Sequence, residues 1–318
     1  FLFEILSMAD KVNNKQEITF FEFTTAAAFL AFSMIKADIL LLEVGLGGRL
    51  DATNVVPNVI ASIITEISFD HEQFLGATLS KISKEKCGII KNGTPVITIS
   101  QKKEIMRVIK ENCLNKNAPL YLIEKKNFKV SSNNFSFCLD KESIDIPIPA
   151  LRGAHQLDNC ALSTSCLKVI SKNFKKFEFK KSIRGIKSVN WPARSQFINN
   201  GKLANKIDKN YVIILDGAHN VSGAKALNKV LSSINTEWQL IFGYLKTRQP
   251  IDFLNELKSI TQKIITTEIT GQENSFTSDE LFEIIQNKGV AVDKSKNLHE
   301  AIEIASKKSK CNFLPLFF

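Results

Sequence analysis

Apolar runs of strand length alternate with stretches of helical period along most of the chain, and this alternation restricts the possible folds more than any other feature. The runs at 38–45 and 59–68 are apolar at nearly every position, which suits strands buried on both faces of a parallel sheet. Further strands are predicted at 94–100 and 119–125, and helices at 18–36, 78–91 (N-cap Thr78 or Ser80) and 102–116.

The segment 127–140 departs from this pattern. Two alternating runs flank Ser-Asn-Asn there, which predicts a β-hairpin, and a helix follows from about residue 155 to 171. The first part of the chain is therefore expected to form a largely parallel sheet with an antiparallel addition.

A second block of the same kind begins near Trp191. Residues 211–220 predict a strand and a turn, followed by a helix at 221–234. Strands with helical patterns after them are predicted at 238–245, 263–269 and 290–294, and the lysine-rich segment 172–190 separates the two blocks. A chain of 318 residues that is 44% hydrophobic can build two cores, so we expect an α/β protein with domains at 1–188 and 189–318.

Composition narrows the function classes. The six cysteines form no C-x-x-C pair, which argues against zinc-finger and thioredoxin-like sites and favours reduced, mostly buried thiols in a cytoplasmic protein. No apolar run reaches the roughly 20 residues that a membrane-spanning helix needs. The net charge is +10, but the lysines are dispersed and no nucleic-acid-binding signature accompanies them, so we expect neither a membrane nor a nucleic-acid partner.

Several polar side chains follow the predicted strands. Ligands of open α/β sheets bind at the carboxyl ends of the strands, which selects these positions as candidates. The candidates are Glu43, the turn 45–51, Asp70, His71, Lys86 on the next helix, and then Asp216, His219 and Asn220.

For three of these candidates a structural role has to be weighed against a functional one. Glu43 would need a partner at the end of a buried strand, because an unpaired buried carboxylate is costly. His71 could cap a helix or lie on the surface, and Lys86 could be a solvated helix lysine. Glu43 and His71 with a third group could instead hold a divalent metal, although Mg²⁺ takes histidine less often than carboxylate.

The glycine-rich segments do not form a phosphate loop. GIIKNGTP (88–95) has two glycines with four residues between them, but Thr94 stands where the lysine is required, and a strand follows instead of a helix. No lysine of that kind follows the turn in LLLEVGLGGRLDATNVV (40–56) either.

Five segments, in order, resemble the folylpolyglutamate synthase/dihydrofolate synthase family of the Mur ligase superfamily. They are LEVGLGGRLDATNVV, SFDHEQFLGATLSKISKEKCGIIK, LRGAHQLDN (151–159), WPARSQ (191–196) and LDGAHNVSGAKAL (215–227), with TFFEF (19–23) and FGYLKTRQP (242–250) agreeing more loosely. The resemblance covers about Thr19 to Ala305. It implies a Mur-ligase-like central ATPase domain, with a mostly parallel sheet, and a smaller Rossmann-like C-terminal domain that handles glutamate.

The resemblance also implies an activity. Proteins of this family use ATP to phosphorylate a pteroate or folate carboxylate, and the L-glutamate amine then attacks the acyl phosphate. We expect a monomeric, cytoplasmic ligase of folate biosynthesis with ATP and Mg²⁺ as cofactors.

Roles for single residues follow from the same resemblance. Glu43 and His71 resemble Mg²⁺ ligands, and Lys86 matches a lysine that is carbamylated and so becomes an anion. His219 is similar to the residue near the phosphate and the incoming glutamate. The remaining assignments are Asn159 to adenine, Arg194 and Asp216 to phosphate and ribose, and Asp51 with Arg49 to the loop that faces the pterin.

The sequence departs from the family pattern in three places. The phosphate loop expected upstream of Glu43 is not among the 318 residues, which predicts a central domain without its P-loop unit and a chain that is inactive by itself. The last residues, CNFLPLFF, lack the Gly-Ser turn of the family's final strand. Ala193 stands where glycine is usual, which is tolerable if its φ is negative.

Three alternatives stay open. The chain could be another Mur-type ligase that acts on a nucleotide-linked peptidoglycan precursor, although GLGGRLDATN is typical of the folate branch. It could be a non-catalytic homologue, as the absent phosphate loop suggests, although Glu43, His71, Lys86, Asp216 and His219 are all present. Nucleic-acid binding through the positive charge is the third.

Overall fold

The structure is a computed structural model that describes residues 1–205, 207, 211–234, 236–306 and 312–316, the last for the backbone only. The chain divides into two compact units, each of which is described by itself. The first unit comprises residues 1–128, 137–144 and 162–177, and the second comprises 129–136, 145–161 and 178–318. The predicted domain boundary at residue 188 stays a prediction.

Two helices begin the first unit, α1 (Leu2–Asn13) and α2 (Phe20–Met34). Thr19 starts α2 with a capping box: its hydroxyl accepts a hydrogen bond from the Glu22 N–H at 3.2 Å, and the Glu22 carboxylate accepts one from the Thr19 N–H at 2.8 Å. The helix predicted at 18–36 is confirmed. Its phenylalanines are largely exposed, with Phe20 at 83%.

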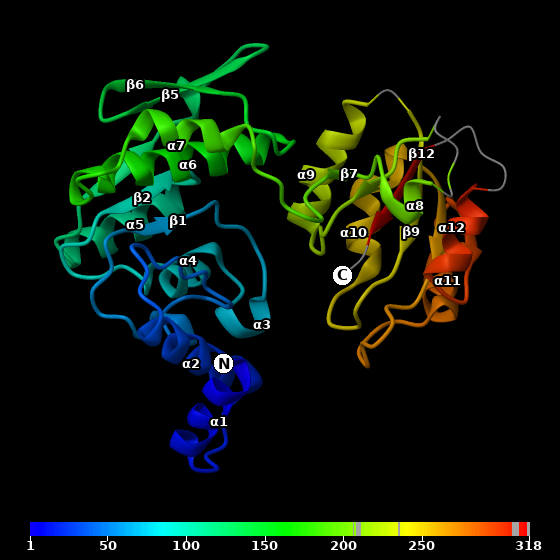
Figure 1. The fold of residues 1–318 in the computed structure, drawn as a ribbon. Coiled ribbons are helices and arrows are strands. Elements are labelled where there is room, and N and C mark those ends of the chain that lie inside the picture. Colours follow the sequence, from blue (N-terminus) through cyan, green and yellow to red (C-terminus); the bar gives the residue numbers. More distant parts are fainter. Residues whose placement is uncertain (206, 208–210, 235, 307–311, 317–318) are drawn as a thin grey trace. The chain divides into compact units, whose positions relative to one another are not determined.

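A three-stranded parallel sheet forms the centre of the first unit, in the order β1 (Ser62–Ile64), β2 (Val96–Ile99), β3 (Leu120–Ile123). The helices α4 (Leu79–Cys87) and α5 (Lys103–Asn115) pack on one face, where Ile82 and Ile109 are fully buried. All four residues of β2 are buried, so both faces of the sheet are covered, as a parallel sheet requires. Figure 1 shows α4 and the second half of α6 (Ala154–Ile170) on opposite sides of these strands.

The predicted elements of this region are confirmed at their centres. Thr78 is the N-cap of α4, and its hydroxyl accepts a hydrogen bond from the Lys81 N–H at 3.2 Å. The helix ends at Cys87, four residues before the end of the predicted range. A short helix, α3 (Glu72–Leu75), and the 3₁₀ turns η1 (Ala52–Val55) and η2 (Lys125–Asn127) complete the connections.

The strand predicted at 38–45 is wrong. These residues form no strand, and most are exposed, including Leu41 at 87% and the Glu43 carboxylate. A strand needs hydrogen-bonding neighbours, and in the described part of the chain β1 pairs only with β2. The apolar pattern therefore indicated a segment suited to burial but could not supply a partner strand. The assumption that Glu43 is buried rested on this strand and is therefore also wrong.

A three-stranded sheet follows in the order β4 (Lys129–Val130), β5 (Asn134–Leu139), β6 (Glu142–Pro147), with β4 antiparallel to β5. The predicted hairpin is confirmed, and β6 adds a strand that was not predicted. The helix expected at 155–171 is α6, and the lysine-rich segment contains η3 (Ser171–Asn173) and α7 (Phe179–Ile186).

The second unit contains a four-stranded parallel sheet in the order β11 (Ala291–Lys294), β10 (Thr261–Thr266), β9 (Trp238–Phe242), β12 (Asn312–Leu316). Against one face pack α9 (Val221–Ser232), α10 (Pro250–Leu257) and α11 (Ser278–Ile285), around Phe242, Phe253 and Leu281. Against the other face packs α12 (Leu298–Ser306), which buries Ala301 and Ala305 on Ile241 and Ile265. Helices on both faces make this a doubly wound unit, as predicted (Figure 1).

Small elements connect this sheet to the rest of the second unit. The strands β7 (Gln196–Phe197) and β8 (Ile214–Leu215) form an antiparallel pair, with α8 (Gly201–Ala204) between them and η4 (Lys258–Ile260) after α10. The strand predicted within 211–220 is thus only two residues long. No helix in the described residues has the length and apolar character needed to cross a membrane.

Candidate functional site

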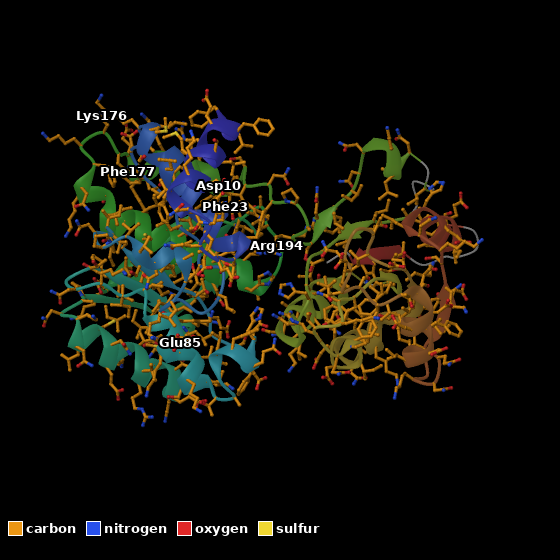
Figure 2. The ribbon with its side chains drawn as sticks, turned by 90° about the horizontal axis from the view of Figure 1, so that it is seen from below. Asp10, Phe23, Glu85, Lys176, Phe177 and Arg194 are labelled. Carbon is orange, nitrogen blue, oxygen red and sulfur yellow. The ribbon has the colours of Figure 1, made fainter. Side chains whose placement is uncertain are left out.

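The predicted site residues fall into two groups, one in each unit. Glu43, Arg49, Asp51, His71 and Lys86 lie in the first, and Asn159, Arg194, Asp216 and His219 in the second. Figure 2 labels Arg194 and also Glu85, which proves important for the first group.

Asp51 organises the loop 43–54 from inside. Its Oδ2 accepts hydrogen bonds from the backbone N–H groups of Gly45 (3.0 Å) and Leu46 (2.9 Å), and its Oδ1 accepts from the Thr53 N–H (2.9 Å) and hydroxyl (2.5 Å). Burial alone would raise the pKa of the Asp51 carboxyl, but these hydrogen bonds outweigh it and hold the pKa below its usual value. The carboxylate therefore shapes the loop, and its contact with a substrate stays a prediction.

The same loop lies against the end of α4. The Arg49 N–H donates to the Glu85 carbonyl at 2.8 Å, and the Arg49 Nε donates to the Glu85 carboxylate at 3.1 Å. A Cβ on Gly88 would lie 2.4 Å from the Arg49 Cα, and one on Gly48 would lie 2.8 Å from the Glu85 carbonyl oxygen. Asn54 completes the contact by donating to the carbonyls of both Arg49 (3.2 Å) and Gly88 (3.1 Å). Only glycine at positions 48 and 88 allows the backbone of the loop to lie so close to the end of α4.

Glu43 and Lys86 carry opposite charges and lie near this contact. Glu43 begins the loop and is exposed, and Lys86 lies half-buried in the last turn of α4. Within the described residues neither side chain has a hydrogen-bond or ion-pair partner. Both are therefore available to a ligand.

His71 occupies the N-cap position of α3, with φ at 51° and no cap hydrogen bond from its side chain. The ring is 41% exposed, and its Nε2 lies 3.8 Å from the Asp70 carboxylate. Among the described residues no three His, Cys, Asp or Glu side chains are grouped as a metal site. Glu43 and His71 would thus need further ligands to hold an ion.

A cleft of about 240 Å³ opens beside Glu43. It runs between α2 and the residues before the loop, and its lining is Phe21, Thr24, Thr25, Ala28, Phe29, Phe32, Leu41, Leu42, Glu43 and Thr53. The Phe21 ring lies directly on Gly45, since a Cβ there would be 2.6 Å from its Cζ. Three phenyl rings, two threonine hydroxyls on α2 and one free carboxylate at the edge suit a flat, partly polar ligand.

Asp216 organises the second group as Asp51 organises the first. It follows β8 directly and is 8% exposed. Its Oδ2 accepts from the Ser195 N–H (2.7 Å) and hydroxyl (3.1 Å), and its Oδ1 accepts from the Ala218 N–H (2.8 Å). The Gly217 N–H then donates to the Ala193 carbonyl at 2.9 Å. The segment WPARSQ is thereby tied to the turn 216–220.

Arg194 stands between two residues in the left-handed region, Ala193 (φ 55°) and Ser195 (φ 46°). The condition under which alanine would be tolerable at this position, a negative φ, is therefore not met, and the backbone there is strained for an alanine. The Arg194 side chain is exposed, and its Nη1 would lie 3.3 Å from a Cβ on Gly217. The turn conformation thus presents the guanidinium beside the residues that follow β8.

Asn159 and His219 are both exposed. Asn159 lies on α6, where its side-chain amide approaches the Gln156 carbonyl oxygen at 3.4 Å. His219 precedes α9, and its Nδ1 lies 3.1 Å from the Gly217 carbonyl oxygen. The helix that follows is capped by Asn220, whose side chain accepts from the Gly223 N–H at 2.8 Å.

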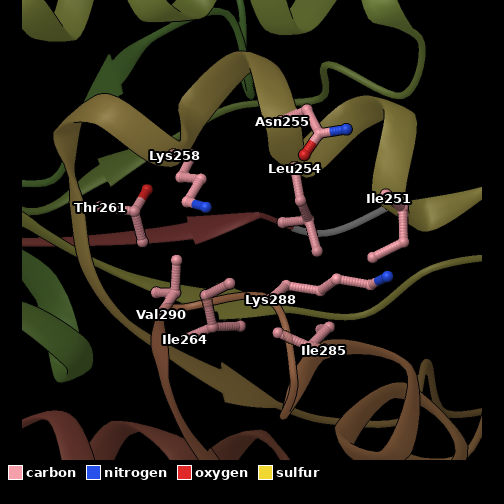
Figure 3. Close-up of a pocket in the computed structure, with 9 residues that line it drawn as sticks. All are labelled: Ile251, Leu254, Asn255, Lys258, Thr261, Ile264, Ile285, Lys288 and Val290. Carbon is pink, nitrogen blue, oxygen red and sulfur yellow. The ribbon is translucent and has the colours of Figure 1, made fainter.

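Another hollow in the second unit is too small for a substrate. It lies between α10, β10 and α11, and Figure 3 shows its lining: Ile251, Leu254, Asn255, Lys258, Thr261, Ile264, Ile285, Lys288 and Val290. Its volume of about 20 Å³ accommodates roughly one water molecule.

The prediction from sequence missed the residues that hold the loops, namely Thr53, Glu85, Ser195, Tyr244 and Arg248. One signal was present, because Asp-Ala-Thr (51–53) has the spacing of an Asx turn, in which the carboxylate accepts the N–H two residues later. The other contacts join distant segments and have no local signature.

No protein-family model matches the chain. It is 30% identical to dihydrofolate synthase/folylpolyglutamate synthase of Bacillus subtilis over 256 residues, which cover 77% of this chain and 57% of that protein. Against dihydrofolate synthetase of Saccharomyces cerevisiae the identity is 36% over 221 residues, covering 67% and 50%.

A third relative is matched over almost the whole chain. It is dihydrofolate synthase/folylpolyglutamate synthase of Buchnera aphidicola subsp. Baizongia pistaciae, 31% identical over 319 aligned positions, which cover 95% of this chain and 67% of that protein. The chain thus spans about half the length of the first two relatives and two thirds of the third.

Solved structures share the fold. Escherichia coli FolC in complex with DHPP and ADP superposes with a TM-score of 0.81 at 23% identity, covering 98% of this chain and 70% of that one. Folylpolyglutamate synthase from Thermotoga maritima gives 0.78 at 26% identity, covering 99% and 72%. The bifunctional synthase of Yersinia pestis, complexed with AMPPNP and Mn ion, gives 0.80 at 22% identity, covering 99% and 72%. The predicted Mur-ligase-like α/β fold is confirmed.

Proposed function

The chain belongs to the dihydrofolate synthase/folylpolyglutamate synthase family, and from this we propose that it works in an ATP-dependent ligase that joins L-glutamate to dihydropteroate, to tetrahydrofolate, or to both. The acceptor carboxylate would take the terminal phosphoryl group of ATP and become an acyl phosphate. The glutamate nitrogen would then attack the carbonyl carbon, and phosphate would leave with the electrons of the broken C–O bond. We expect a cytoplasmic monomer.

The cleft beside Glu43 is the observation that carries this proposal. Its phenyl rings suit a pteridine ring, which is flat and heteroaromatic, and its hydroxyls suit the polar edge of that ring. The position next to the loop 43–54 supports Arg49 and Asp51 as parts of the acceptor site, Arg49 as a cation and Asp51 through the loop conformation that it maintains.

The nucleotide is assigned to the second group. Arg194 would bind phosphate oxygens, Asp216 would fix the turn that presents this arginine and would approach the ribose, and Asn159 would contact adenine. The complexes of E. coli FolC with ADP and of the Y. pestis synthase with AMPPNP support an ATP site in such a protein. His219 would lie where the glutamate amine loses its proton.

A divalent cation fits the free carboxylate of Glu43, with His71 as a second ligand. Mg²⁺ commonly takes one or two carboxylates and completes its coordination with waters and substrate phosphates, so the absence of a three-residue cluster from the described residues is compatible with it. Such an ion would neutralise phosphate charge. Lys86 as an ammonium would oppose it, whereas a carbamate on Lys86 would reverse that charge, and ¹³C-bicarbonate NMR would detect the carbamate.

The 318 residues alone are expected to be inactive. They contain no glycine-rich turn that ends in Gly-Lys-Ser or Gly-Lys-Thr, and loss of one preorganised set of phosphate contacts is worth on the order of several kcal/mol in a transition state. Turnover by this chain alone would refute this expectation.

The test is glutamate-dependent phosphate release by the complete gene product. Dihydropteroate, tetrahydrofolate and a nucleotide-linked peptidoglycan precursor would each be offered as acceptor, and release is expected with at least one of the first two. Phe21→Ala should weaken acceptor binding, whereas Phe20→Ala, which alters an exposed ring outside the cleft, should not. Release with the peptidoglycan precursor alone, or with none of the three, would contradict the proposal.

A further inference from the structure

The side chain of Gln101 continues the contact between β1 and β2 beyond the ends of both strands. Gln101 follows the end of β2 by two residues. Its Oε1 accepts a hydrogen bond from the Ile67 N–H at 2.7 Å, and its Nε2 donates to the Thr65 carbonyl oxygen at 3.1 Å. These partners determine the orientation of the amide, because an N–H group can only donate and a carbonyl oxygen can only accept. The amide therefore replaces the backbone partners that residues 65–67 would have in a longer strand.

A buried hydroxyl and a buried side chain fix the two ends of the same segment. The Thr98 hydroxyl, in a fully buried residue, donates to the Ile64 carbonyl oxygen at 2.8 Å and accepts from the Gln101 Nε2 at 3.3 Å. The Ile67 side chain is 5% exposed and belongs to the core that α4 and α5 cover. The chain thus leaves β1 along a path that side chains from the end of β2 hold in place.

The turn that follows carries His71 between two anchors in the same core. Ile67 precedes it by four residues, and Leu75 of α3 follows it by four and is 8% exposed. The His71 carbonyl accepts from the Leu75 N–H at 3.0 Å, which ties the histidine to the second anchor. Leu75 also lies against the loop 43–54, because a Cβ on Gly47 would be 2.9 Å from its Cδ2. The position of His71 relative to this loop therefore depends on where the chain leaves Ile67.

We propose that Gln101 is a positioning residue that fixes where His71 lies relative to Glu43. It acts by holding residues 65–67, from which the turn with His71 departs. In the proposed function, on which the next step rests, Glu43 and His71 share a divalent cation. Gln101 touches neither the ion nor a substrate, yet a displaced His71 would bind the ion less well. Groups that orient metal ligands typically account for roughly 10- to 100-fold in metal affinity.

Gln101→Met tests this role, because it keeps the length of the side chain and removes both polar groups. Hydrogen exchange followed by NMR should show a protected Ile67 amide in the original chain and roughly 5- to 10-fold less protection in the variant, since one hydrogen bond is lost. The signals of His71, identified with His71→Gln, should shift as well. Gln101→Glu retains the acceptor for the Ile67 N–H and should recover most of the protection.

The matched control is Thr94→Val at the opposite end of the same two strands. Thr94 is 7% exposed, and its hydroxyl donates to the Val59 carbonyl oxygen at 3.3 Å. This variant therefore also loses a hydrogen bond between the segments that lead into β1 and β2. It should lower the stability of the unit without changing the signals of His71.

Mn²⁺ separates a positioning role from a purely structural one, because this paramagnetic ion broadens the NMR signals of the groups that bind it. The Mn²⁺ concentration that broadens the His71 signals should rise about 10-fold or more in Gln101→Met and stay unchanged in Thr94→Val. Equal concentrations for the original chain and a folded Gln101→Met, or full protection of Ile67 in that variant, would overturn the proposal. Absence of broadening from the original chain would contradict the cation site itself, and hydrogen exchange with the His71 shifts would then decide the role of Gln101.

Discussion

At the scale of single residues, Asp51 and Asp216 have the same environment in different units. Each is 8% exposed, and each accepts a hydrogen bond from the backbone N–H two residues later and another from a hydroxyl. Sequence patterns placed both beside ligands, because polar side chains after strands often bind them. The structure shows that their carboxylates first hold the loops in shape.

Asp51→Asn tests this role. The amide Nδ2 would replace an oxygen that now accepts from two backbone N–H groups, so donors would face donors, at a cost of about 1–3 kcal/mol in the free energy of unfolding. Asp38→Asn, at an exposed carboxylate, is the control and should change little. Urea denaturation at pH 7 measures both, and an Asp51→Asn protein as stable as the control would contradict the assignment.

The pH dependence of this contribution has a definite sign. Because the pKa of Asp51 is lowered by folding, its stabilisation is fully present above the ordinary carboxyl pKa and is lost as the pH falls through the folded value. Denaturation curves between pH 7 and pH 3 should therefore converge for the original chain and Asp51→Asn as the pH falls.

At the scale of elements, the contact between the loop 43–54 and the end of α4 depends on close approach. Gly88→Ala would place its Cβ 2.4 Å from the Arg49 backbone, so the loop must move, at a cost of about 2 kcal/mol or more. Gly185→Ala is the matched control, since it lies in α7 with nothing within 4 Å of its Cβ and should stabilise by about 0.5–1 kcal/mol. Equal denaturation midpoints for the two variants would refute this account.

Elements with local signals were predictable from sequence. Thr78 or Ser80 marked the start of α4, which begins after Thr78, and Ser-Asn-Asn marked the hairpin of β4 and β5. The run 38–45 was not, because an apolar pattern reports suitability for burial and not the presence of a neighbouring strand. The positive φ of Ala193 could not be predicted from the sequence either. It accompanies hydrogen bonds between WPARSQ and the turn after β8, and these two segments are distant in sequence.

At the scale of the whole molecule, each unit has its own core. Ile109 is fully buried in the core of the first unit and Phe253 in that of the second. Calorimetry should resolve two transitions, because separate cores need not unfold together. Ile109→Ala should lower one of them and Phe253→Ala the other, each by about 2–5 kcal/mol of unfolding free energy. A shift of the same single transition by both variants would show that the units unfold as one.

The approach of α4 to the loop also has a genetic consequence. A single-nucleotide change turns any glycine codon into an alanine codon, so both substitutions described above arise readily by chance. At Gly185 the change should be selectively neutral. At Gly88 the added methyl group meets the backbone of Arg49, as well as its side chain, so no second mutation at codon 49 could remove the clash. Suppressors of a Gly88→Ala allele should therefore map to residues that let the whole loop shift.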